Sequence, residues 1–439
     1  MHNRIRGGSA HRRPDRTGGA VSRAADTPAV SSNARAEFAD VVIVGGGAAG
    51  LSLAHRLART GTGDFVVVQP SHGPLRPPER TWCHWAEGPG EFESAVSASW
   101  QRLRVRGPDG SAVVSDPSPM TYRMIRSGAF EELVHRGLAG HPRARLVRGA
   151  VHGIRQYPGG AEVVCTLAEG GRLALHGRYV FDSRPLPLLP PARTVLLQHF
   201  RGWFVRTASD RFDPGVADLM DFRVPQPRHG LAFGYVLPLA PDHALVEYTE
   251  FSRAPLTSAG YGAALRHYAG RVLRLGPYSV VAEEQGVIPM TDARFPRRVG
   301  PSVYRIGAAG GATRPATGYT FSAVQRQSRD IAAALRAGGR EIVPPPYSRR
   351  ALAMDAVLLR GIDAGRIDGP AFFTDLFRTV PGERLLRFLD GRTTPREEFA
   401  IGLRTPVAPM LRTVAELPFL RRRTRPGAIG APRPEENPR

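Results

Sequence analysis

The chain has 439 residues, a length that can bury a large core and that favours two or three domains. Its 60 basic residues outnumber the 39 acidic ones and give a net charge of +21, and every basic residue is arginine. The absence of lysine excludes Schiff-base catalysis and the lysine of a P-loop phosphate site. The positive surplus favours anionic partners, namely nucleic acid, anionic lipid headgroups or an acidic substrate.

Cysteine usage and the first residues of the chain indicate a cytoplasmic protein. Cys83 and Cys165 are its two cysteines, too few for a disulfide framework or a cysteine metal cluster. Residues 1–37 are rich in arginine, glycine and serine and lack the apolar core of a signal peptide, so we expect a disordered basic arm. No stretch reaches the roughly 18 apolar residues of a membrane-spanning helix, so none is expected.

The most informative stretch is residues 40–57, DVVIVGGGAAGLSLAHRL. Its β-branched run predicts a strand buried on both faces of a parallel sheet, and the apolar residues after the glycines recur at helical spacing. Gly45, Gly47 and Gly50 have the GxGxxG spacing of a dinucleotide site. The first permits a tight turn, the second the approach of a pyrophosphate, and the third close packing of the helix. The helix N-terminus would supply free N–H groups for the phosphates.

Residues 64–68 predict the second strand of this domain. Gln69 follows that strand, at the place where dinucleotide folds usually carry a carboxylate for the ribose hydroxyls, and its amide can make a weaker hydrogen bond there. A cluster of aromatic residues comes next, in the sequence TWCHW of residues 81–85. Trp82 and Trp85 either line an apolar pocket beside the cofactor or belong to a local core.

The next hundred residues predict the remainder of the first half of the protein. Residues 122–138 predict the end of a strand and then a helix with Ser127 as its N-cap. Alternating segments at residues 145–182 predict a small antiparallel sheet whose last strand returns to the first domain. Residues 185–191 contain four prolines, which mark a domain boundary.

Residues 194–284 consist of short β-rich runs separated by turn residues, the pattern of an antiparallel sheet. If one face of the strand at residues 244–251 lines a pocket, burial would raise the pKa of Glu247 and suit it to proton transfer. The alternative is a solvated glutamate. Alternation places Leu245, Glu247, Thr249 and Phe251 on one face and Val246, Tyr248 and Glu250 on the other.

A strand, a turn of small residues and a helix over residues 302–335 would complete the first domain. We therefore expect this domain to be discontinuous, with residues 38–185 and 285–340 enclosing a substrate domain at residues 186–284.

The last part of the chain predicts helices. Residues 341–420 contain apolar stretches separated by arginines, which fit either a helical cap with solvated arginines or a surface that lies on lipid. Residues 421–439 are rich in proline and arginine and predict a disordered basic tail.

Several motifs occur in order along the chain: the glycine turn, MDFR at residues 220–223, VEYTEFS at residues 246–252 and RPATGY at residues 314–319. Together they resemble the flavin-dependent lycopene β-cyclases of carotenoid synthesis, over residues 38–415. The resemblance implies an α/β fold with a Rossmann-like FAD-binding domain of the aromatic-hydroxylase type. It also implies an inserted antiparallel β-sheet substrate domain and a C-terminal helical region.

The activity implied by the resemblance is a redox-neutral cyclisation of the ψ-end groups of lycopene to β-rings, which gives γ-carotene or β-carotene. The reaction requires reduced FAD, with NAD(P)H as the electron source. An acid protonates C2 of the terminal C1=C2 bond, the C5=C6 bond attacks C1 to close the ring, and loss of the C6 proton completes the isomerisation. Glu247 matches the glutamate that is proposed to transfer the proton in that family.

The resemblance also assigns binding residues, and no metal is expected. Asp221 and Arg223 could form a structural ion pair instead of lining the substrate pocket. Glu250 is the weaker candidate for the acid. Gly307-Ala308-Ala309 stands where many related flavoproteins have an aspartate that the cyclases commonly lack. The substrate pocket is expected to include Trp82, Trp85, Asp221, Arg223, Tyr248 and Glu250. FAD is expected to bind Gly45, Gly47, Gly50, Gln69, Arg126, Gly307, Gly310, Pro315, Gly318 and Tyr319.

The expected partners are lycopene or a related acyclic carotenoid and a membrane surface that contains anionic lipid. Because such a substrate resides in the bilayer, we expect a cytoplasmic protein that associates peripherally with the membrane. An FAD-dependent monooxygenase and a reductase of isoprenoid double bonds would share the glycine turn and are the alternatives. A nucleic-acid-binding protein is a third reading, but the sequence contains no recognised nucleic-acid module, and no nucleic-acid partner is expected.

Overall fold

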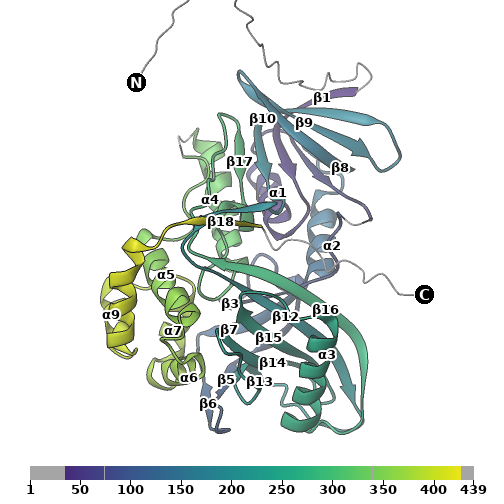
Figure 1. Cartoon of the computed structure of the whole chain (residues 1–439). Helices are drawn as coiled ribbons and strands as arrows, with labels where there is room; N and C mark the ends of the chain where they lie inside the picture. Colours follow the sequence, from purple (N-terminus) through teal and green to yellow (C-terminus); the bar gives the residue numbers. More distant parts are fainter. Residues whose placement is uncertain (1–34, 74, 339–340, 427–439) are drawn as a thin grey trace, which may run out of the picture.

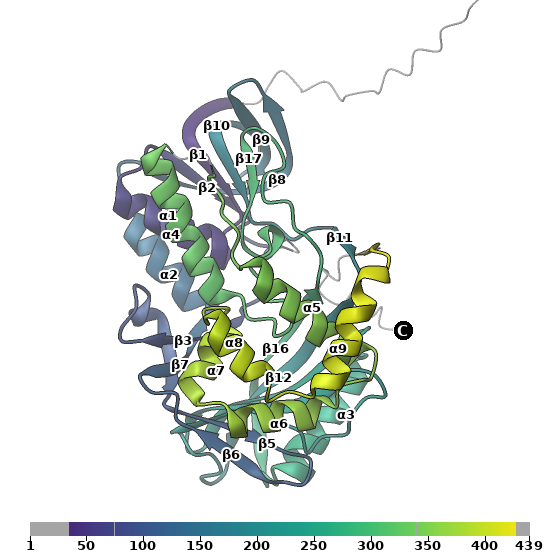
Figure 2. The ribbon, with the colours of Figure 1, turned by 90° about the vertical axis from the view of Figure 1, so that its left-hand side faces the viewer.

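The computed structural model describes residues 35–73, 75–338 and 341–426 (Figure 1). Two sheets occupy opposite ends of the molecule, and the C-terminal helices lie against the second sheet (Figure 2). This arrangement leaves the junction between the sheets available for a binding site.

Both expected disordered ends lie almost wholly outside the described residues. Where the arm expected at residues 1–37 enters the described part, it begins strand β1. Where the tail expected at residues 421–439 leaves it, Arg423–Pro426 forms strand β18, which pairs with β11 (Leu188–Ala192). The proline-rich stretch that predicted a boundary therefore contains a short strand.

The first sheet has a parallel core. Its strands run parallel in the order β8, β2, β1, β10, β17. Strand β9 pairs antiparallel with the C-terminal part of β8 and with the N-terminal part of β10. The small antiparallel sheet that the sequence predicted is thus an extension of the parallel one. The bounds are β1 (Arg35–Val44), β2 (Phe65–Gln69), β8 (Ala144–Tyr157), β9 (Gly160–Leu167), β10 (Arg172–Asp182) and β17 (Val303–Arg305).

The last four residues of strand β1, residues 41–44, are buried on both faces, as the β-branched run predicts. Val41 and Ile43 face the helices α1 (Ala48–Thr60), α2 (Ser127–Leu138) and α4 (Phe321–Ala337), whereas Val42 and Val44 face the β8–β9–β10 extension. Each such buried side chain stabilises the fold by about 1.5 to 3 kcal/mol relative to an exposed one. The sheet and its helices together hold the glycine turn in place.

One detail of α2 differs from expectation. Ser127 is the first residue of the helix and not its N-cap, because its hydroxyl accepts a hydrogen bond from the Arg80 N–H instead of capping the helix.

A three-stranded sheet in the order β3, β7, β4 connects the two ends of the molecule. Its strands are β3 (Thr81–Glu87), which carries the TWCHW cluster, β7 (Met120–Arg126) and β4 (Val96–Trp100).

The second large sheet has seven strands in the order β16, β12, β15, β14, β13, β5, β6. All neighbouring pairs are antiparallel except β13 and β5. Strands β5 and β6 come from the segment predicted for the first domain but join this sheet, and β16 crosses residue 285. The predicted domain boundaries stay predictions. The bounds are β16 (Tyr278–Thr291), β12 (Val195–Thr207), β15 (His243–Ser252), β14 (Leu231–Ala240), β13 (Val216–Asp221), β5 (Arg102–Arg106) and β6 (Ala112–Ser115).

Helices cover both faces of the second sheet. One face packs against α3 (Ser258–His267) and the π-helical turn Tyr268–Val272. The other face packs against the C-terminal helices, of which three have side-chain N-caps, at Ser348, Asp368 and Thr394. These helices are α5 (Arg349–Asp363), α6 (Gly369–Thr379), α7 (Gly382–Leu389), α8 (Pro395–Gly402) and α9 (Val407–Glu416).

A buried ion pair fastens the C-terminal helices to the loop before α4. Arg314 Nε lies 2.7 Å from Asp355 Oδ2 of α5, and both side chains are almost completely buried. The two atoms are not aligned as a hydrogen bond, so the contact is mainly electrostatic. Burial raises the pKa of Asp355 to about 6, which leaves it mostly ionised at neutral pH.

We expect Asp355→Asn to lower the free energy of unfolding by about 3 kcal/mol, because it leaves a buried guanidinium without a counter-charge. Asp375→Asn is the matched control, since Asp375 pairs with Arg378 on the exposed surface of α6 and its loss should cost under about 1 kcal/mol. Urea unfolding followed by tryptophan fluorescence measures both. Equal losses in the two variants would contradict the assignment.

Candidate active site

The glycine turn joins β1 to α1 and has the geometry that its spacing predicts. Gly45 has φ +104°, and a Cβ there would lie 2.3 Å from Ser183 Oγ. A Cβ at Gly50 would lie 1.9 Å from the Gly45 carbonyl oxygen, so only glycine permits this packing of helix on strand. Gly47 faces open space and caps α1 without a side-chain hydrogen bond. The first N–H groups of α1 are therefore available for an anionic ligand.

Gln69 lies directly behind this turn, where a Cβ on Gly46 would meet its amide oxygen at 1.5 Å. The Gln69 amide donates to Glu131 of α2 at 3.0 Å, and its buried oxygen has no partner among the described residues. Arg76 binds the same Glu131 carboxylate at 2.6 Å. Helix α2 thus places the carboxylate of Glu131 beside position 69, where the sequence has an amide. No local sequence pattern indicates this neighbour.

A second turn of small residues meets the first one. It is η3 (Gly307–Gly310), which follows β17, and a Cβ on Gly307 would lie 2.7 Å from that of Ala49 in α1. The Gly307 N–H donates to Gln327 of α4 at 2.8 Å. Gly310 is buried in this turn, and Pro315 is buried in the loop that follows.

That loop leads into a large cavity at the junction of the sheets. The cavity has about 1120 Å³ of empty space, part of it open to solvent, and Gly318 and Tyr319 contribute to its wall. Beside Gly318, the side-chain oxygens of Gln198 and Thr317 are shielded from solvent and lack a partner in the described structure. Most of the wall is apolar and includes Phe200, Phe233, Leu245, Phe251, Phe373 and Leu389.

These observations fit a dinucleotide cofactor. The open helix N-terminus suits phosphates, the unpaired Gln69 oxygen suits a ribose hydroxyl, and the unpaired oxygens of Gln198 and Thr317 suit polar groups of the cofactor that reach the cavity.

Glu247 projects from β15 into the cavity and is the main ionisable group of its wall. Its side chain shares the cavity face with Leu245, Thr249 and Phe251, as the strand alternation predicted. Burial, and then the negative charge of Glu284, raise the pKa of Glu247 to about 8. The Thr249 hydroxyl donates to Glu247 Oε1 at 2.5 Å, which lowers the pKa only partly. The carboxyl is therefore mostly protonated at neutral pH.

Glu284 is a second carboxyl in the cavity that the sequence did not reveal. Glu247 on β15 and Glu284 on β16 both pair with Gly202 of the central strand β12, so they share a register and a face. Burial raises the pKa of Glu284, while a hydrogen bond from Thr81 at 2.6 Å and the charge of Arg126 oppose the rise. The alternation of β16 would have indicated Glu284 only if the register with β12 had been known.

Arg126 was expected to bind the cofactor, but its donors engage protein groups beside the cavity. It donates to Glu284 at 3.1 Å, to Thr81 at 2.9 Å and to Glu79 at 2.5 Å. Its guanidinium also lies over the ring of Phe204, 4.5 Å from the centroid. The position of Arg126 therefore links it to the second carboxyl.

The tryptophans of the TWCHW cluster divide between the cavity and its support. Trp82 lines the cavity and stacks on Phe321 of α4, with ring centroids 5.8 Å apart. Trp85 is buried behind the wall and packs edge-to-face on Tyr319, with ring centroids 4.6 Å apart. Trp82 is thus a direct candidate for substrate contact, and Trp85 supports Tyr319.

Four residues that were expected in the substrate pocket lie elsewhere. Arg223 pairs with the fully buried Asp221 at 2.6 Å, and Tyr268 also donates to Asp221, which agrees with the structural ion-pair interpretation. Tyr248 and Glu250 lie on the opposite face of β15 from Glu247, where the Tyr248 hydroxyl donates to Glu250 at 3.3 Å. Neighbours along a strand alternate between faces, so sequence proximity to Glu247 was misleading.

Comparison with known families identifies the family to which the chain belongs. The model of a family described as lycopene cyclase protein matches residues 40–415. The chain belongs to the lycopene cyclase family. No curated protein matched the chain.

Solved structures with the same fold are distant in sequence from this lycopene cyclase family member. A flavoprotein/dehydrogenase from Cytophaga hutchinsonii has a TM-score of 0.60 at 12% identity, over 87% of this chain and all of the other. A geranylgeranyl bacteriochlorophyll reductase-like protein from Thermoplasma acidophilum has a TM-score of 0.54 at 13% identity, over 88% of this chain and all of the other. The p-nitrophenol 4-monooxygenase PnpA of Pseudomonas putida gives 0.53 at 15% identity, over 88% of this chain and 99% of its own. The predicted fold class is confirmed.

Two further properties apply to the described residues only. None of their helices combines the length and the apolar character needed to cross a bilayer. No three histidine, cysteine, aspartate or glutamate side chains among them gather as a metal site.

The raised pKa of Glu247 predicts an effect on stability. The unfolded chain ionises this group near its ordinary pKa of 4.5 and the folded chain only near 8, so wild-type stability falls as pH rises between those values. Glu247→Gln removes this loss. We expect the variant to be more stable than wild type by roughly 3 kcal/mol near neutral pH, and equally stable below about pH 4.5.

Thermal unfolding at several pH values checks this expectation. Glu283→Gln, at an exposed position next to Glu284, is the control and should follow wild type throughout. A Glu247→Gln variant that is destabilised at about pH 8 would show that the carboxyl is ionised and paired in the folded protein.

Proposed function

We propose that this member of the lycopene cyclase family is a lycopene β-cyclase, which isomerises the ψ-end groups of lycopene to β-rings without net oxidation or reduction. The observation that carries the proposal is Glu247, a carboxyl with a pKa near 8 in the wall of a large apolar cavity. An alkene is a weak base and its protonation yields a carbocation. A neutral carboxylic acid in a site shielded from water is therefore the catalyst that this chemistry needs.

In the proposed reaction, Glu247 donates its proton to C2 of the terminal C1=C2 bond and leaves a tertiary cation at C1. The C5=C6 bond attacks C1 and closes the six-membered ring, which moves the positive charge to C5. Loss of the C6 proton to the Glu247 carboxylate forms the new double bond and restores the acid. Atoms and electrons balance without an external oxidant or reductant, as an isomerisation requires.

The walls of the cavity assist by excluding water and by facing the cation with electron-rich groups. Apolar side chains such as Phe251 and Phe373 offer no hydrogen bond to a water molecule that could trap the cation. The indole ring of Trp82 can add about 1 to 2 kcal/mol of cation–π stabilisation in such a desolvated site. Arg126 holds the Glu284 carboxyl in place beside the cavity.

The cofactor is proposed to be FAD in its reduced form, with NAD(P)H as the electron source. The glycine turn, Gln69 and the Gly307–Gly310 turn would hold it. When bound, reduced FAD supplies electron density that stabilises positive charge in the substrate.

The partners proposed are lycopene or a related acyclic carotenoid and a membrane surface that contains anionic lipid. The protein is proposed to be cytoplasmic and to associate with that surface peripherally. The net charge of +21 supports attraction to anionic headgroups.

An FAD-dependent monooxygenase or a reductase of isoprenoid double bonds is the second candidate, since proteins named for such activities share the fold. A monooxygenase would add oxygen to its product and a reductase would add hydrogen, whereas a cyclase leaves the mass unchanged.

Expression in a lycopene-accumulating host tests the proposal. We expect wild type to convert lycopene to cyclic carotene of the same mass, measured by chromatography with mass detection. Glu247→Gln should lower the yield at least about a hundredfold, because the amide cannot donate the proton, while flavin absorbance of the purified variant persists. Glu283→Gln is the control and should cyclise normally. Normal cyclisation by Glu247→Gln, or a product that has gained oxygen or hydrogen, would contradict the proposal.

The pH dependence of cyclisation tests the coupling of the two glutamates. The rate should fall as pH rises through about 8, because Glu247 loses its proton. Glu284→Gln removes a negative charge that raises the pKa of Glu247, so its rate should fall at a lower pH than that of wild type. Initial rates across the pH range measure the shift. An unchanged or higher midpoint in Glu284→Gln would exclude this coupling.

A further inference from the structure

Helix α9 is amphipathic in the reverse of the usual sense. Two of its polar side chains face the protein, since Thr413 has no exposed surface and Glu416 is partly buried against α5, whereas Arg412 is exposed. Its large apolar side chains face outward, with Leu411 62% and Val414 49% exposed. A surface helix of a globular protein normally buries its apolar stripe, so this orientation needs a cause.

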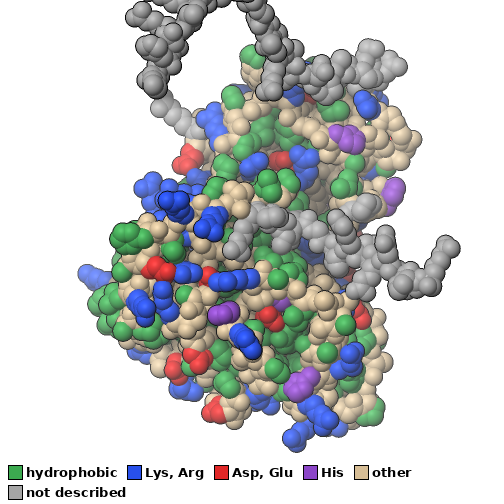
Figure 3. Space-filling model, in the orientation of Figure 1, with side chains coloured by type: hydrophobic (Ala, Val, Ile, Leu, Met, Phe, Trp, Pro, Cys, Tyr) green, Lys and Arg blue, Asp and Glu red, His purple; other side chains and the backbone are tan. Residues whose placement is uncertain are grey.

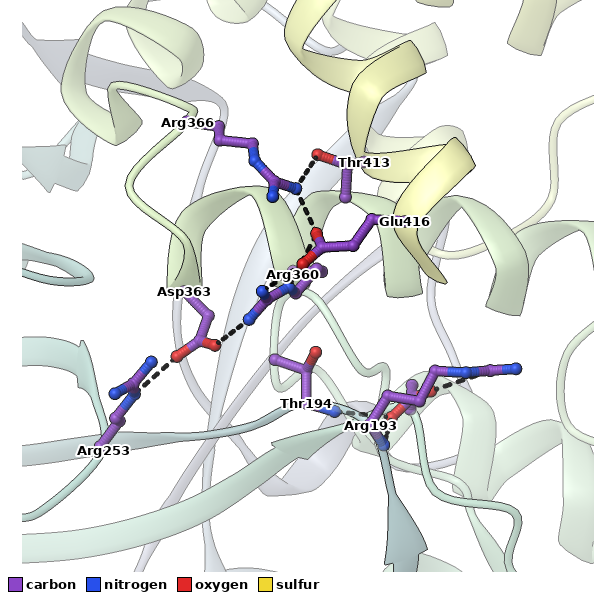
Figure 4. A network of polar contacts seen from close by, with 9 residues as sticks. Arg193, Thr194, Arg253, Arg360, Asp363, Arg366, Thr413 and Glu416 are labelled. Carbon is purple, nitrogen blue, oxygen red and sulfur yellow. Dashed lines mark hydrogen bonds and ion pairs between the residues drawn. The ribbon is translucent and has the colours of Figure 1, made fainter. Parts of the chain in front are cut away.

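A polar network fixes α9 in this orientation (Figure 4). Arg360 of α5 donates to Glu416 at 2.6 Å and to Asp363 at 2.9 Å. Arg253, in the loop after β15, donates to Asp363 at 2.7 Å. Arg366 donates to both Glu416 and Thr413. Charge-assisted hydrogen bonds of this kind are stronger than neutral ones, so the inward face of α9 is firmly held.

The outward apolar side chains of α9 recur at helical spacing and therefore share one side of the helix, which the turn after α9 extends. We call this surface the α9 face, which consists of Val407, Leu411, Val414 and Phe419. Phe419, just beyond α9, is 86% exposed. Figure 3 shows hydrophobic side chains along the edge of the molecule that α9 occupies, with arginines around them. Contiguous exposed apolar side chains of this size mark an interaction site.

The charges around the α9 face identify its partner. Arg404, Arg412, Arg421 and Arg423 are exposed beside it, and Glu416, the single acidic residue of positions 403–424, is neutralised by the network beneath. Apolar side chains with a basic rim match a membrane surface, where acyl chains accept the former and anionic headgroups the latter. A second copy of the chain would bring the same arginines face to face, which repels.

We propose that the α9 face docks on the surface of an anionic lipid bilayer and that α9 lies in the plane of the headgroups. This inference deepens the proposed function and rests on it for the source of the substrate. Met410 of α9 and Ile401 of α8 pack in the same hydrophobic cluster as Phe373 and Leu389, which line the cavity. The docked face is therefore joined by packed apolar side chains to the site that would receive a lipid-dissolved substrate.

Vesicle flotation of the full chain tests this proposal without any substrate. Wild type should float with vesicles of phosphatidylcholine and phosphatidylglycerol, and bind weakly to phosphatidylcholine alone. The double variant Leu411→Glu/Val414→Glu should bind the mixed vesicles at least about tenfold more weakly, because two charged side chains replace inserted apolar ones. Both positions are exposed, so circular dichroism and the melting temperature should stay as in wild type.

Val281→Glu is the matched control, since Val281 is 55% exposed on β16, outside the α9 face, and this variant should float like wild type. Arg412→Gln should weaken binding to the mixed vesicles but not to phosphatidylcholine. Flotation of the double variant like wild type would overturn the proposal. The proposal would also be overturned if wild type were a dimer that does not bind vesicles and the double variant were a monomer. The α9 face would then join two copies of the chain.

The outcome is separable from that of the proposed function. A chain that floats through the α9 face but leaves lycopene unchanged contradicts the cyclase and supports the docking site. If the chain is a cyclase, the double variant should cyclise lycopene presented in detergent micelles like wild type and lycopene presented in vesicles at least about tenfold more slowly. Equal losses in both presentations would count against docking.

Discussion

The proposed chemistry depends on keeping one glutamate neutral inside an apolar wall. Among the described residues Glu247 receives one side-chain hydrogen bond, from Thr249, and otherwise faces mostly apolar side chains and the negative charge of Glu284. Arg126 donates hydrogen bonds to Glu284, Thr81 and Glu79. If the guanidinium bound Glu247 instead, the pKa of that acid would fall and the proton would be lost at neutral pH. The placement of Arg126 at Glu284 thus favours Glu247 as the acid.

The loop between η3 and α4 connects this acid to the other parts of the structure. At one end it follows the turn that contacts α1 at the glycine turn. In its middle Arg314 is held by Asp355 of α5, and near its other end Gly318 and Tyr319 form part of the cavity wall. A shift of the C-terminal helices would therefore be transmitted to the glycine turn and to the cavity together, because close-packed interiors transmit displacement.

The sequence predicted those features that depend on local pattern. The β-branched run and the glycine spacing predicted the first strand and its turn, and alternation along residues 244–251 predicted which side chains share a face with Glu247. It could not predict Glu284 or Glu131, because each depends on which distant strand or helix lies alongside. The same limit explains why β5 and β6 joined the second sheet unexpectedly. Asp221 and Tyr248 were expected in the pocket because they belong to the motifs that carry the resemblance, and the alternation of strands and the packing of α3 and the turn after it place them elsewhere.

Glu247 and the α9 face both depart from ordinary burial, and they have complementary causes. Glu247 is a polar group inside an apolar wall, and the α9 face is an apolar surface outside a polar underside. Each departure lowers folding stability, and such violations of local rules concentrate at functional sites. The fold offsets each one nearby, with the Thr249 hydroxyl at Glu247 and with the Arg360 and Arg366 network beneath α9. An apolar substrate that leaves a bilayer and is protonated in a dry cavity would give both departures the same origin.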